Sequence, residues 1–185
     1  MDMLREKISH GFDLLDADGD GALTEADHVI MGDRAADQLG HARGSAEHTR
    51  MVDAYVAIWH GLHAQHAGAA DGRLTKEEFT TGVLALAGDP EAAAATVGAL
   101  ARAFFAIADA DADGLVSRPE FDAFQRSHFP GIGRADLDAA FGRLDRDGDG
   151  TLDPAEFESA VVEYWSSTDP DAPGNWWMGR PDTRH

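Results

Sequence analysis

The sequence predicts an all-α fold in which four helix–loop–helix units associate as two pairs. The first observation is a twelve-residue stretch that occurs four times without gaps, at residues 16–27, 67–78, 109–120 and 145–156. The second is that apolar residues flank these stretches at the i, i+3 and i+4 spacing of amphipathic helices. The third is charge: 34 Asp and Glu against 15 Lys and Arg give a net charge of −19, and many of these acids fall inside the repeated stretches.

The first unit is built around residues 16–27, DADGDGALTEAD. Carboxylates at positions 1, 3 and 5 of such a loop, a glycine at position 6 and a carboxylate at position 12 are the pattern of a calcium loop, in which the glycine permits the sharp turn around the ion. Position 7 offers its backbone carbonyl, and position 9 binds directly or through water. The predicted metal ligands of this loop are Asp16, Asp18, Asp20, Ala22, Thr24 and Asp27.

Asp27 is the one departure of the first loop from the full pattern, which has Glu at position 12. Asp is shorter by one methylene, so one of its oxygens reaches an ion more easily than two do. Mg²⁺ takes fewer ligands than Ca²⁺ and loses less from that change. The sequence therefore predicts a first site that is weaker for Ca²⁺ and more tolerant of Mg²⁺ than the others.

The second loop, residues 67–78, keeps the framework of a calcium site but has lost most of its ligands. Ala67 and Ala69 occupy positions 1 and 3, which leaves only Asp71 and Glu78 as side-chain ligands. The interpretation is a degenerate loop that braces the first hand, with an apolar strand contact between its position 8 and that of the first loop, Leu74 and Leu23. A weak or differently selective ion site is the alternative.

The third and fourth loops match the EF-hand pattern D-x-[DN]-x-[DN]-G-x₅-E in full. The predicted ligands are Asp109, Asp111, Asp113, Leu115, Ser117 and Glu120 in the third loop, and Asp145, Asp147, Asp149, Thr151, Asp153 and Glu156 in the fourth. Two complete copies 36 residues apart predict a tight cooperative pair. Crowded carboxylates repel one another without metal, so metal binding is expected to couple to folding and to raise the melting temperature.

Domain organisation follows from the order of the loops. Residues 1–87 are expected to form the N-terminal pair, residues 92–166 the C-terminal pair, and residues 167–185 a tail that packs on the core. The linker at 88–92, GDPEA, is short, so the halves are expected to pack together. In the tail, Pro170 and Pro173 end the preceding helix, and Trp176 and Trp177 are too apolar to leave in water. Either the tail is a packing latch, or it is a removable plug in a target groove.

Composition excludes several classes of function. There is no cysteine, hence no disulfide framework and no thiolate metal site. No apolar run is expected to reach the length of about 18 residues needed for a membrane span, and the opening residues lack the features of a secretory signal. The acidic balance disfavours nucleic acid and anionic membranes as partners. No G-x-S-x-G or phosphate loop appears, so a cytoplasmic, monomeric, non-enzymatic protein is expected, with calcium ions as its ligands and any protein partner left open.

Histidines gather before the degenerate loop, in WHGLHAQH (59–66). His60, His63 and His66 recur at three-residue spacing, and His63 stands where the other hands have phenylalanine. Three interpretations stay open: a more polar entering helix, a transition-metal site that uses His60 and His63, and a chromophore pocket of the kind photoproteins have.

With one near-complete, one inactive and two complete loops in that order, followed by the tail SSTDPDAPGNWWMG (166–179), the chain resembles the sarcoplasmic calcium-binding proteins and their bacterial, calerythrin-type members. The resemblance implies a compact helical globule of two EF-hand pairs that binds three Ca²⁺ ions as a buffer or carrier. A sensor that exposes an apolar surface is the main alternative, although the chain has only five Met for a Met-rich groove. A protein that binds a luciferin or chromophore is a further one.

Overall fold

The computed structural model describes residues 2–64 and 72–179. Its N-terminal half comprises α1 (Asp2–Leu15), β1 (Ala22–Leu23), α2 (Glu25–Gln38), α3 (Ala46–Ile58), the π-helix η1 (Trp59–His63), β2 (Leu74–Thr75) and α5 (Lys76–Ala87). Its C-terminal half comprises α6 (Pro90–Ala108), β3 (Val116–Ser117), α7 (Arg118–His128), α8 (Arg134–Leu144), β4 (Thr151–Leu152), α9 (Pro154–Ser166) and the 3₁₀ helix η2 (Pro173–Trp176). The predicted all-α fold of EF-hand units is confirmed.

Each exit helix starts in the same way, because positions 9 and 12 of every loop form a capping box. In such a box the N-cap side chain bonds the backbone of the third helical residue, whose side chain bonds back to the N-cap N–H. The pairs are Thr24 with Asp27, Thr75 with Glu78, Ser117 with Glu120, and Asp153 with Glu156. The degenerate second loop therefore keeps its helix-starting chemistry even though it has lost Asp at positions 1 and 3.

Short antiparallel strands join the loops in pairs. Leu23 of β1 lies opposite Leu74 of β2, and Val116 of β3 lies opposite Leu152 of β4. All four side chains are buried. The predicted contact between Leu23 and Leu74 is confirmed, and it fixes the register of the second loop against the first.

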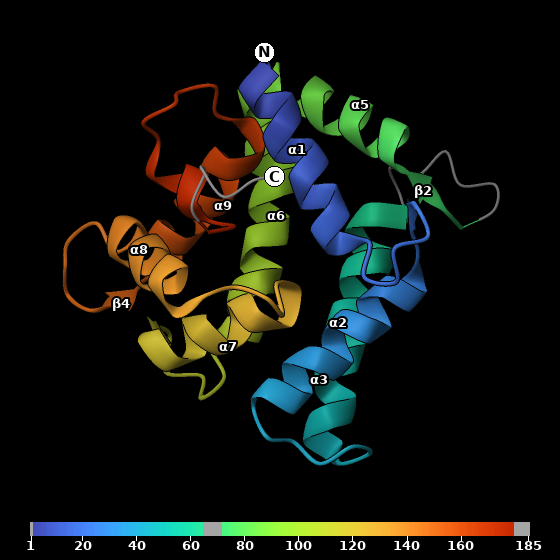
Figure 1. The fold of residues 1–185 in the computed structure, drawn as a ribbon, viewed down its shortest axis with the longest axis vertical. Coiled ribbons are helices and arrows are strands. Elements are labelled where there is room, and N and C mark those ends of the chain that lie inside the picture. The colour runs from blue at the N-terminus through green and yellow to red at the C-terminus, as the bar shows by residue number, and fades with distance from the viewer. Residues whose placement is uncertain (1, 65–71, 180–185) are drawn as a thin grey trace.

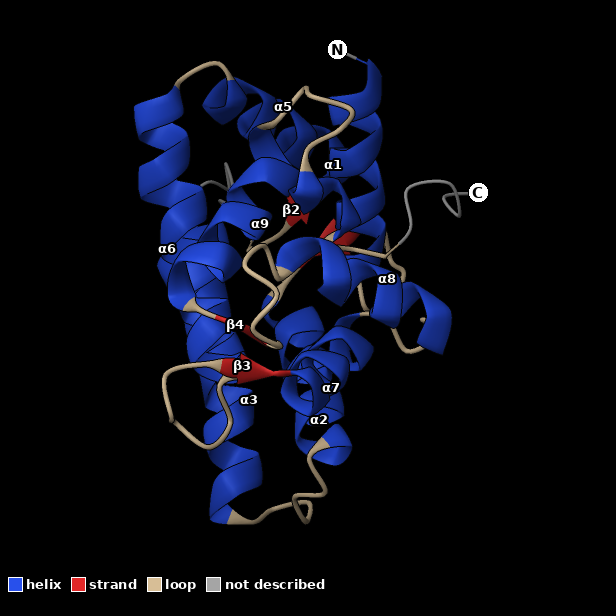
Figure 2. Cartoon of the chain, turned by 90° about the vertical axis from the view of Figure 1, so that its left-hand side faces the viewer, coloured by secondary structure: helices blue, strands red, loops and turns tan. Residues whose placement is uncertain are grey.

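The two halves are held together by helix packing (Figure 1). Helix α6 runs between the N-terminal helices and the group α7–α9, and it packs along α9, while α2 packs on both α3 and α7. Figure 2, which views the molecule from the side, shows β3 next to β4 and apart from β2. Aromatic rings packed edge to face fill the core, for example Phe79 against both Phe12 and Trp165, with ring centroids 5.6 Å apart in each case.

The tail after α9 returns to the C-terminal hands. Trp177 is 2% exposed, and its ring lies 4.8 Å from that of Phe157 and 5.9 Å from that of Phe124, centroid to centroid. Trp176 is half-buried, with the Arg143 guanidinium 5.2 Å from its ring centroid. The tail therefore lies on the apolar faces of the exit helices α7 and α9.

A fully buried lysine fastens the tail to the first helix. The ammonium of Lys7 on α1 donates to the carbonyl oxygens of Glu163 and Ser167, at 3.2 and 2.8 Å. It also donates to Oδ1 of Asn175 in the tail, at 2.8 Å. Carbonyls at a helix C-terminus carry partial negative charge, so a buried cation is stabilised there. Lys7 thus joins α1, the end of α9 and the tail at one point.

The expectation about membrane-spanning length needs correction at α6. The stretch Glu91–Ala108 is long and apolar enough to cross a membrane by length and composition alone, with a mean hydropathy of 1.4. The reason is its alanine content, which raises hydropathy without the bulk typical of a lipid-facing helix. Of this stretch, 44% is buried inside the protein, and α6 packs on α9.

Candidate metal centre

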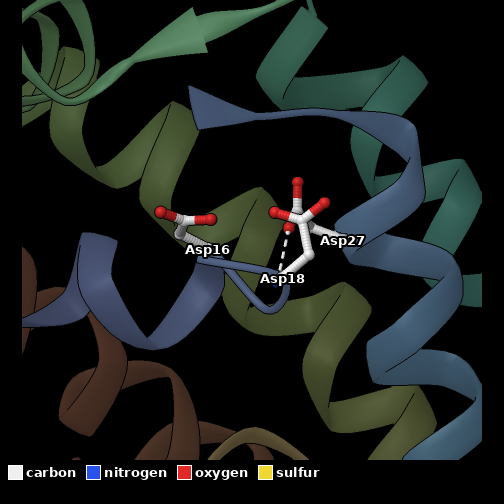
Figure 3. A group of neighbouring side chains, drawn as sticks. All are labelled: Asp16, Asp18 and Asp27. Carbon is white, nitrogen blue, oxygen red and sulfur yellow. Dashed lines mark hydrogen bonds between the residues drawn. The ribbon is translucent and has the colours of Figure 1, made fainter. Parts of the chain in front are cut away.

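The first acidic group comes from both ends of the loop at residues 16–27. Carboxylate oxygens of Asp16, Asp18 and Asp27 lie within 4.8 Å of one another. Figure 3 shows these three side chains, with the backbone N–H of Asp18 donating to Oδ1 of Asp27. Asp16 follows α1, and Asp27 belongs to the first turn of α2, so the loop folds back until position 12 meets position 1.

Backbone N–H groups orient the first carboxylate of the loop. Oδ1 of Asp16 accepts from the N–H groups of Gly19 and Asp20, at 2.9 and 3.1 Å, and Oδ2 accepts from Gly21 at 2.9 Å. Gly19 and Gly21 have φ of 75° and 85°, which only glycine adopts without strain. The turn that brings these donors inward therefore depends on glycine at positions 4 and 6.

Asp27 uses both of its oxygens despite its shorter side chain. Oδ1 accepts from the N–H of Ala17 at 2.9 Å, and Oδ2 accepts from the N–H and hydroxyl of Thr24, at 2.8 and 3.0 Å. The side chain is fully buried. Glu120 forms the corresponding bonds in the third loop, to the N–H of Ala110 at 2.9 Å and to that of Ser117 at 2.8 Å. The substitution is therefore accommodated locally by the same contacts.

Two further groups repeat the arrangement in the C-terminal half. Oxygens of Asp109, Asp111 and Glu120, and of Asp145, Asp147 and Glu156, lie within 4.8 Å of one another in each group. Burial acts to raise the pKa of Glu120, but bonds from Ser117 and from the N–H groups of residues 110 and 111 outweigh it and lower the pKa. The Glu120 carboxylate is therefore ionised at neutral pH.

The carboxylates at position 5 lie outside these three groups. Oδ1 of Asp20, Asp113 and Asp149 accepts the N–H of position 7 instead, at 3.0, 2.9 and 2.8 Å. The Thr151 hydroxyl also donates to Asp149, and with the Thr151 N–H it lowers the pKa of that carboxyl. The remaining predicted ligands are the position 7 residues Ala22, Leu115 and Thr151, which begin β1, precede β3 and begin β4, and the N-caps Thr24, Ser117 and Asp153.

The donor sets fit a hard divalent cation. Each group offers only carboxylate oxygens, which Ca²⁺ and Mg²⁺ prefer over softer ligands. Opposite ligands of a Ca²⁺ ion, at bond lengths of about 2.3–2.6 Å, lie about 4.6–5.2 Å apart, and the oxygens of each group, all within 4.8 Å of one another, are close enough to contact one ion. The three groups therefore fit three Ca²⁺ sites.

The second loop contributes no such group within the part of the chain that the structure describes. Ala67, Ala69 and Asp71 lie outside the described residues. Glu78 is described, and its Oε2 accepts from the N–H and hydroxyl of Thr75, at 2.9 and 2.7 Å. The hydroxyl bond, followed by the backbone bond, lowers the pKa of Glu78. Glu78 thus serves the capping box of α5.

The histidines of residues 59–66 separate in the structure. His60 is exposed, and its Nε2 lies 3.0 Å from Oε2 of Glu25. His63 is buried, and its Nδ1 lies 2.9 Å from Nε2 of His28, a residue that the sequence analysis did not single out. The structure therefore does not bring His60 and His63 together as metal ligands, and His66 lies outside the described residues.

His28 connects this histidine pair to the first loop. Its Nδ1 lies 2.8 Å from the carbonyl oxygen of Thr24, and burial lowers its pKa. A helical spacing of four residues from the N-cap was the only sequence signal, and histidine at such a position is common without any function. The partner His63 lies 35 residues away, so sequence reasoning had no means to find the pair.

Comparison with protein families identifies the C-terminal hands. The family model described as EF hand matches residues 101–125 and 137–162. These ranges contain the third and fourth loops with parts of their flanking helices.

Three curated proteins are similar over much of the chain. Calerythrin of Saccharopolyspora erythraea is 27% identical over 86% of this chain and 90% of its own length. Obelin of Obelia geniculata is 30% identical over 92% of this chain and 87% of its own length. The sarcoplasmic calcium-binding protein of Hediste diversicolor is 27% identical over 66% of this chain and 68% of its own length.

Solved structures share the fold. A calcium-binding protein of Streptomyces coelicolor, described for prokaryotic calcium-mediated regulation, has a TM-score of 0.70 and 27% identity over 90% of this chain and 99% of its own. The Ca-loaded apo form of coelenterazine-binding protein from Renilla muelleri has a TM-score of 0.80 and 22% identity, over 96% of this chain and 94% of its own. The latter shows likeness of fold alone.

Proposed function

The chain belongs to the EF-hand proteins of the calerythrin and sarcoplasmic calcium-binding protein type, and from this premise we propose that it is an intracellular Ca²⁺ buffer or carrier with three active sites. The active loops are the first, third and fourth, and the ligands are those predicted from the sequence. The second loop serves as a brace. The protein acts as a monomer in the cytoplasm, without enzymatic activity.

The observation that carries this proposal is the threefold recurrence of one acidic group at three loops. Each Ca²⁺ ion offsets two units of the formal charge of −19, and it does so where carboxylates crowd together. Because an ion that binds only the folded state stabilises it, one site adds about 4 kcal/mol at a thousandfold excess over its dissociation constant. Binding and folding are therefore coupled in each half.

Calorimetric titration of Ca²⁺ into metal-free protein tests the stoichiometry. We expect three ions per chain. Glu156→Gln should remove one of them, because a neutral amide replaces the carboxylate that the ion requires, while Gln can still form the capping box. Glu78→Gln is the matched control in the degenerate loop and should leave three. Uptake of fewer than three ions by the unaltered chain, or loss of an ion with Glu78→Gln, would contradict the assignment.

The first site is proposed to be the weakest for Ca²⁺ and the most tolerant of Mg²⁺, because Asp27 stands at position 12. Repeating the titration at millimolar Mg²⁺ should lower Ca²⁺ affinity most at this site. Asp27→Glu should reduce that difference. Unchanged affinity and unchanged selectivity in Asp27→Glu would count against the proposal.

A sensor role is the second candidate, and the described role of the Streptomyces coelicolor protein in calcium-mediated regulation favours it. Against it stands the tail, since Trp177 already covers Phe124 and Phe157 on the exit helices. Deletion of residues 170–185 separates the two roles. Loss of stability alone supports the buffer with a packing latch, whereas a Ca²⁺-dependent gain in binding of the dye ANS supports a sensor whose groove the tail plugs.

A ligand-binding role like that named for coelenterazine-binding protein receives less support. The apolar pocket lined by Leu15, His63, Phe79 and Trp165, among others, has a volume of about 80 Å³. Pockets that bind drug-sized ligands have volumes of about 300 Å³ or more. The small volume counts against a chromophore of that size in this pocket.

A further inference from the structure

We propose that Arg73, in the degenerate second loop, is a built-in cation that competes with Ca²⁺ at the first loop and thereby sets the affinity of that site. The inference rests on the proposed function, because it assumes that the first loop binds the ion. It assigns to the second loop a role beyond bracing: that loop supplies a positive charge to its partner.

The geometry starts from the register of the two strands. Arg73 occupies position 7 of its loop and directly precedes β2, whose Leu74 lies opposite Leu23 of β1. This pairing holds the Arg73 side chain beside the acidic half of the first loop. Its Nη2 lies 3.0 Å from Oδ2 of Asp20, the predicted ligand at position 5.

The contact engages the second oxygen of the Asp20 carboxylate. Oδ1 of Asp20 accepts from the N–H of Ala22 at 3.0 Å, and Oδ2 accepts from the Arg73 guanidinium. Ca²⁺ needs six to eight oxygens, and position 5 is one of the few side chains able to supply them. An ion that uses Oδ2 must therefore displace Arg73 or share the carboxylate with it.

The C-terminal pair lacks this arrangement. Position 7 is uncharged in both loops there, Leu115 and Thr151. Neither Asp113 nor Asp149 has an ion-pair partner within residues 2–64 and 72–179. The arginine of the fourth loop, Arg146, is directed instead toward Glu163 on α9, with 2.6 Å between Nη2 and Oε1.

The size of the effect follows from exposure. The side chains of Arg73 and Asp20 are 45% and 40% exposed, so water screens their attraction. Exposed ion pairs contribute up to about 1 kcal/mol, which corresponds to roughly a fivefold change in affinity. The guanidinium also repels a dication directly, and this repulsion weakens at high salt. Arg73 thus makes the first site the weaker one by a moderate, salt-dependent factor.

The backbone amide of one glycine in each active loop gives an NMR signal that reports on that loop alone. The position 6 glycines, Gly21, Gly114 and Gly150, donate their N–H to the position 1 carboxylates of their own loops, at 2.9, 3.1 and 3.0 Å. An ion that draws on the position 1 carboxylate alters this hydrogen bond. Titration of ¹⁵N-labelled protein with Ca²⁺, followed by NMR, therefore reports the affinity of each loop individually.

The experiment compares Arg73→Ala with Lys76→Ala. Lys76 lies in the same hand and carries the same charge, but its Nζ pairs with Asp13 on α1 at 2.6 Å, outside the loop ligands. Arg73→Ala should tighten Ca²⁺ binding at the Gly21 signal by roughly two- to fivefold at low salt, and by less at high salt. The Gly114 and Gly150 signals should titrate as before, and Lys76→Ala should change the Gly21 affinity less than Arg73→Ala does.

Each contrary result has its own meaning. An unchanged Gly21 affinity in Arg73→Ala, or an equal change in Lys76→Ala, overturns the role of Arg73 and leaves the calcium-binding function standing, since Gly114 and Gly150 still titrate. If no glycine signal of the unaltered protein responds to Ca²⁺, the proposed function itself fails. The melting temperature of the metal-free variants gives a second readout, because removal of the Arg73–Asp20 pair should lower it slightly.

Discussion

The N-terminal and C-terminal hand pairs share one backbone plan but differ in what balances their acidic loops. In the C-terminal pair both loops carry a complete acidic group. Among the described residues of the N-terminal pair such a group is found at the first loop, and the second loop directs Arg73 and Lys76 toward Asp20 and Asp13. A loop that has lost its metal ligands can thus still stabilise its partner, because its basic side chains form ion pairs with the partner's carboxylates.

The interiors of the two pairs differ as well. In the C-terminal pair the entering and exit helices meet through edge-to-face aromatic contacts, such as Phe121 with Phe141 at 5.4 Å between centroids. In the N-terminal pair His63 stands at one of these positions and bonds His28. A hydrogen-bonded pair of imidazoles keeps its geometry without an ion, whereas the C-terminal pair carries two acidic loops that repel when metal-free. The C-terminal pair should therefore depend more strongly on Ca²⁺.

Metal removal should expose this difference with the largest effect. Addition of EGTA is expected to lower the melting temperature by about 10 °C or more, because each of the three sites loses up to about 4 kcal/mol of stabilisation by the ion. Hydrogen exchange should accelerate more at β3–β4 than at β1–β2, because two ions are lost from the one pair and one from the other. Equal acceleration in both sheets would refute the difference, and a melting curve unmoved by EGTA would refute the coupling itself.

The differences between the N-terminal and C-terminal hand pairs could be predicted only in part from the sequence. The loops and their carboxylates are encoded locally, since carboxylates and glycines recur at fixed offsets. The contact of Leu23 with Leu74 follows from aligning the repeat, because both residues stand at position 8. The pairs Arg73–Asp20 and His28–His63 join residues 53 and 35 positions apart. Lys7 reaches Asn175 across 168 positions. Such contacts depend on how the loops pair and how the helices pack, and no local pattern distinguishes them from ordinary surface charges or core histidines.

Acidification should lower the free energy of unfolding through a buried histidine of the C-terminal half. His128 on α7 lies among Phe104, Phe124 and Tyr55, and burial lowers its pKa to about 4. Between pH 6.5 and 4 the unfolded chain binds a proton at this residue and the folded chain does not. Stability is therefore lost as the pH falls through this window, by up to about 1.4 kcal/mol per pH unit, and below pH 4 this contribution no longer changes.

Replacement of this imidazole tests that assignment. His128→Phe keeps a ring among aromatic neighbours and should make the unfolding free energy fall less steeply between pH 6.5 and 4. His60→Gln is the control, because His60 is 61% exposed in its side chain. Urea denaturation at a series of pH values measures both slopes. If His60→Gln flattens the profile as much as His128→Phe does, burial at residue 128 is not the cause.

The smallest expected effect on stability comes from position 4 of the third loop. There the third loop has alanine, whereas the first and fourth loops have glycine. Position 4 is glycine in those two loops, Gly19 and Gly148, with φ of 75° and 74°. In the third loop it is Ala112, which adopts a φ of 60°. A left-handed conformation costs a residue with a Cβ about 1–2 kcal/mol. Glycine avoids this strain, but it lowers the free energy of unfolding by about 0.4–1 kcal/mol, because it gives the unfolded chain more conformational entropy. Ala112→Gly should therefore stabilise the protein by about 0.5 kcal/mol.

The reciprocal substitution in the fourth loop provides the matched control. A Cβ added at Gly148 would meet no atom within 4 Å, so Gly148→Ala isolates the backbone preference from packing. It should destabilise the Ca²⁺ form by about the amount that Ala112→Gly stabilises it, and calorimetric melting of both variants measures the two shifts. If the two substitutions act only through the backbone preference of their own loops, their effects add, and the double variant should return to the melting temperature of the unaltered chain. If Ala112→Gly lowers the melting temperature instead, the side chain of Ala112 must contribute a contact that outweighs its backbone strain.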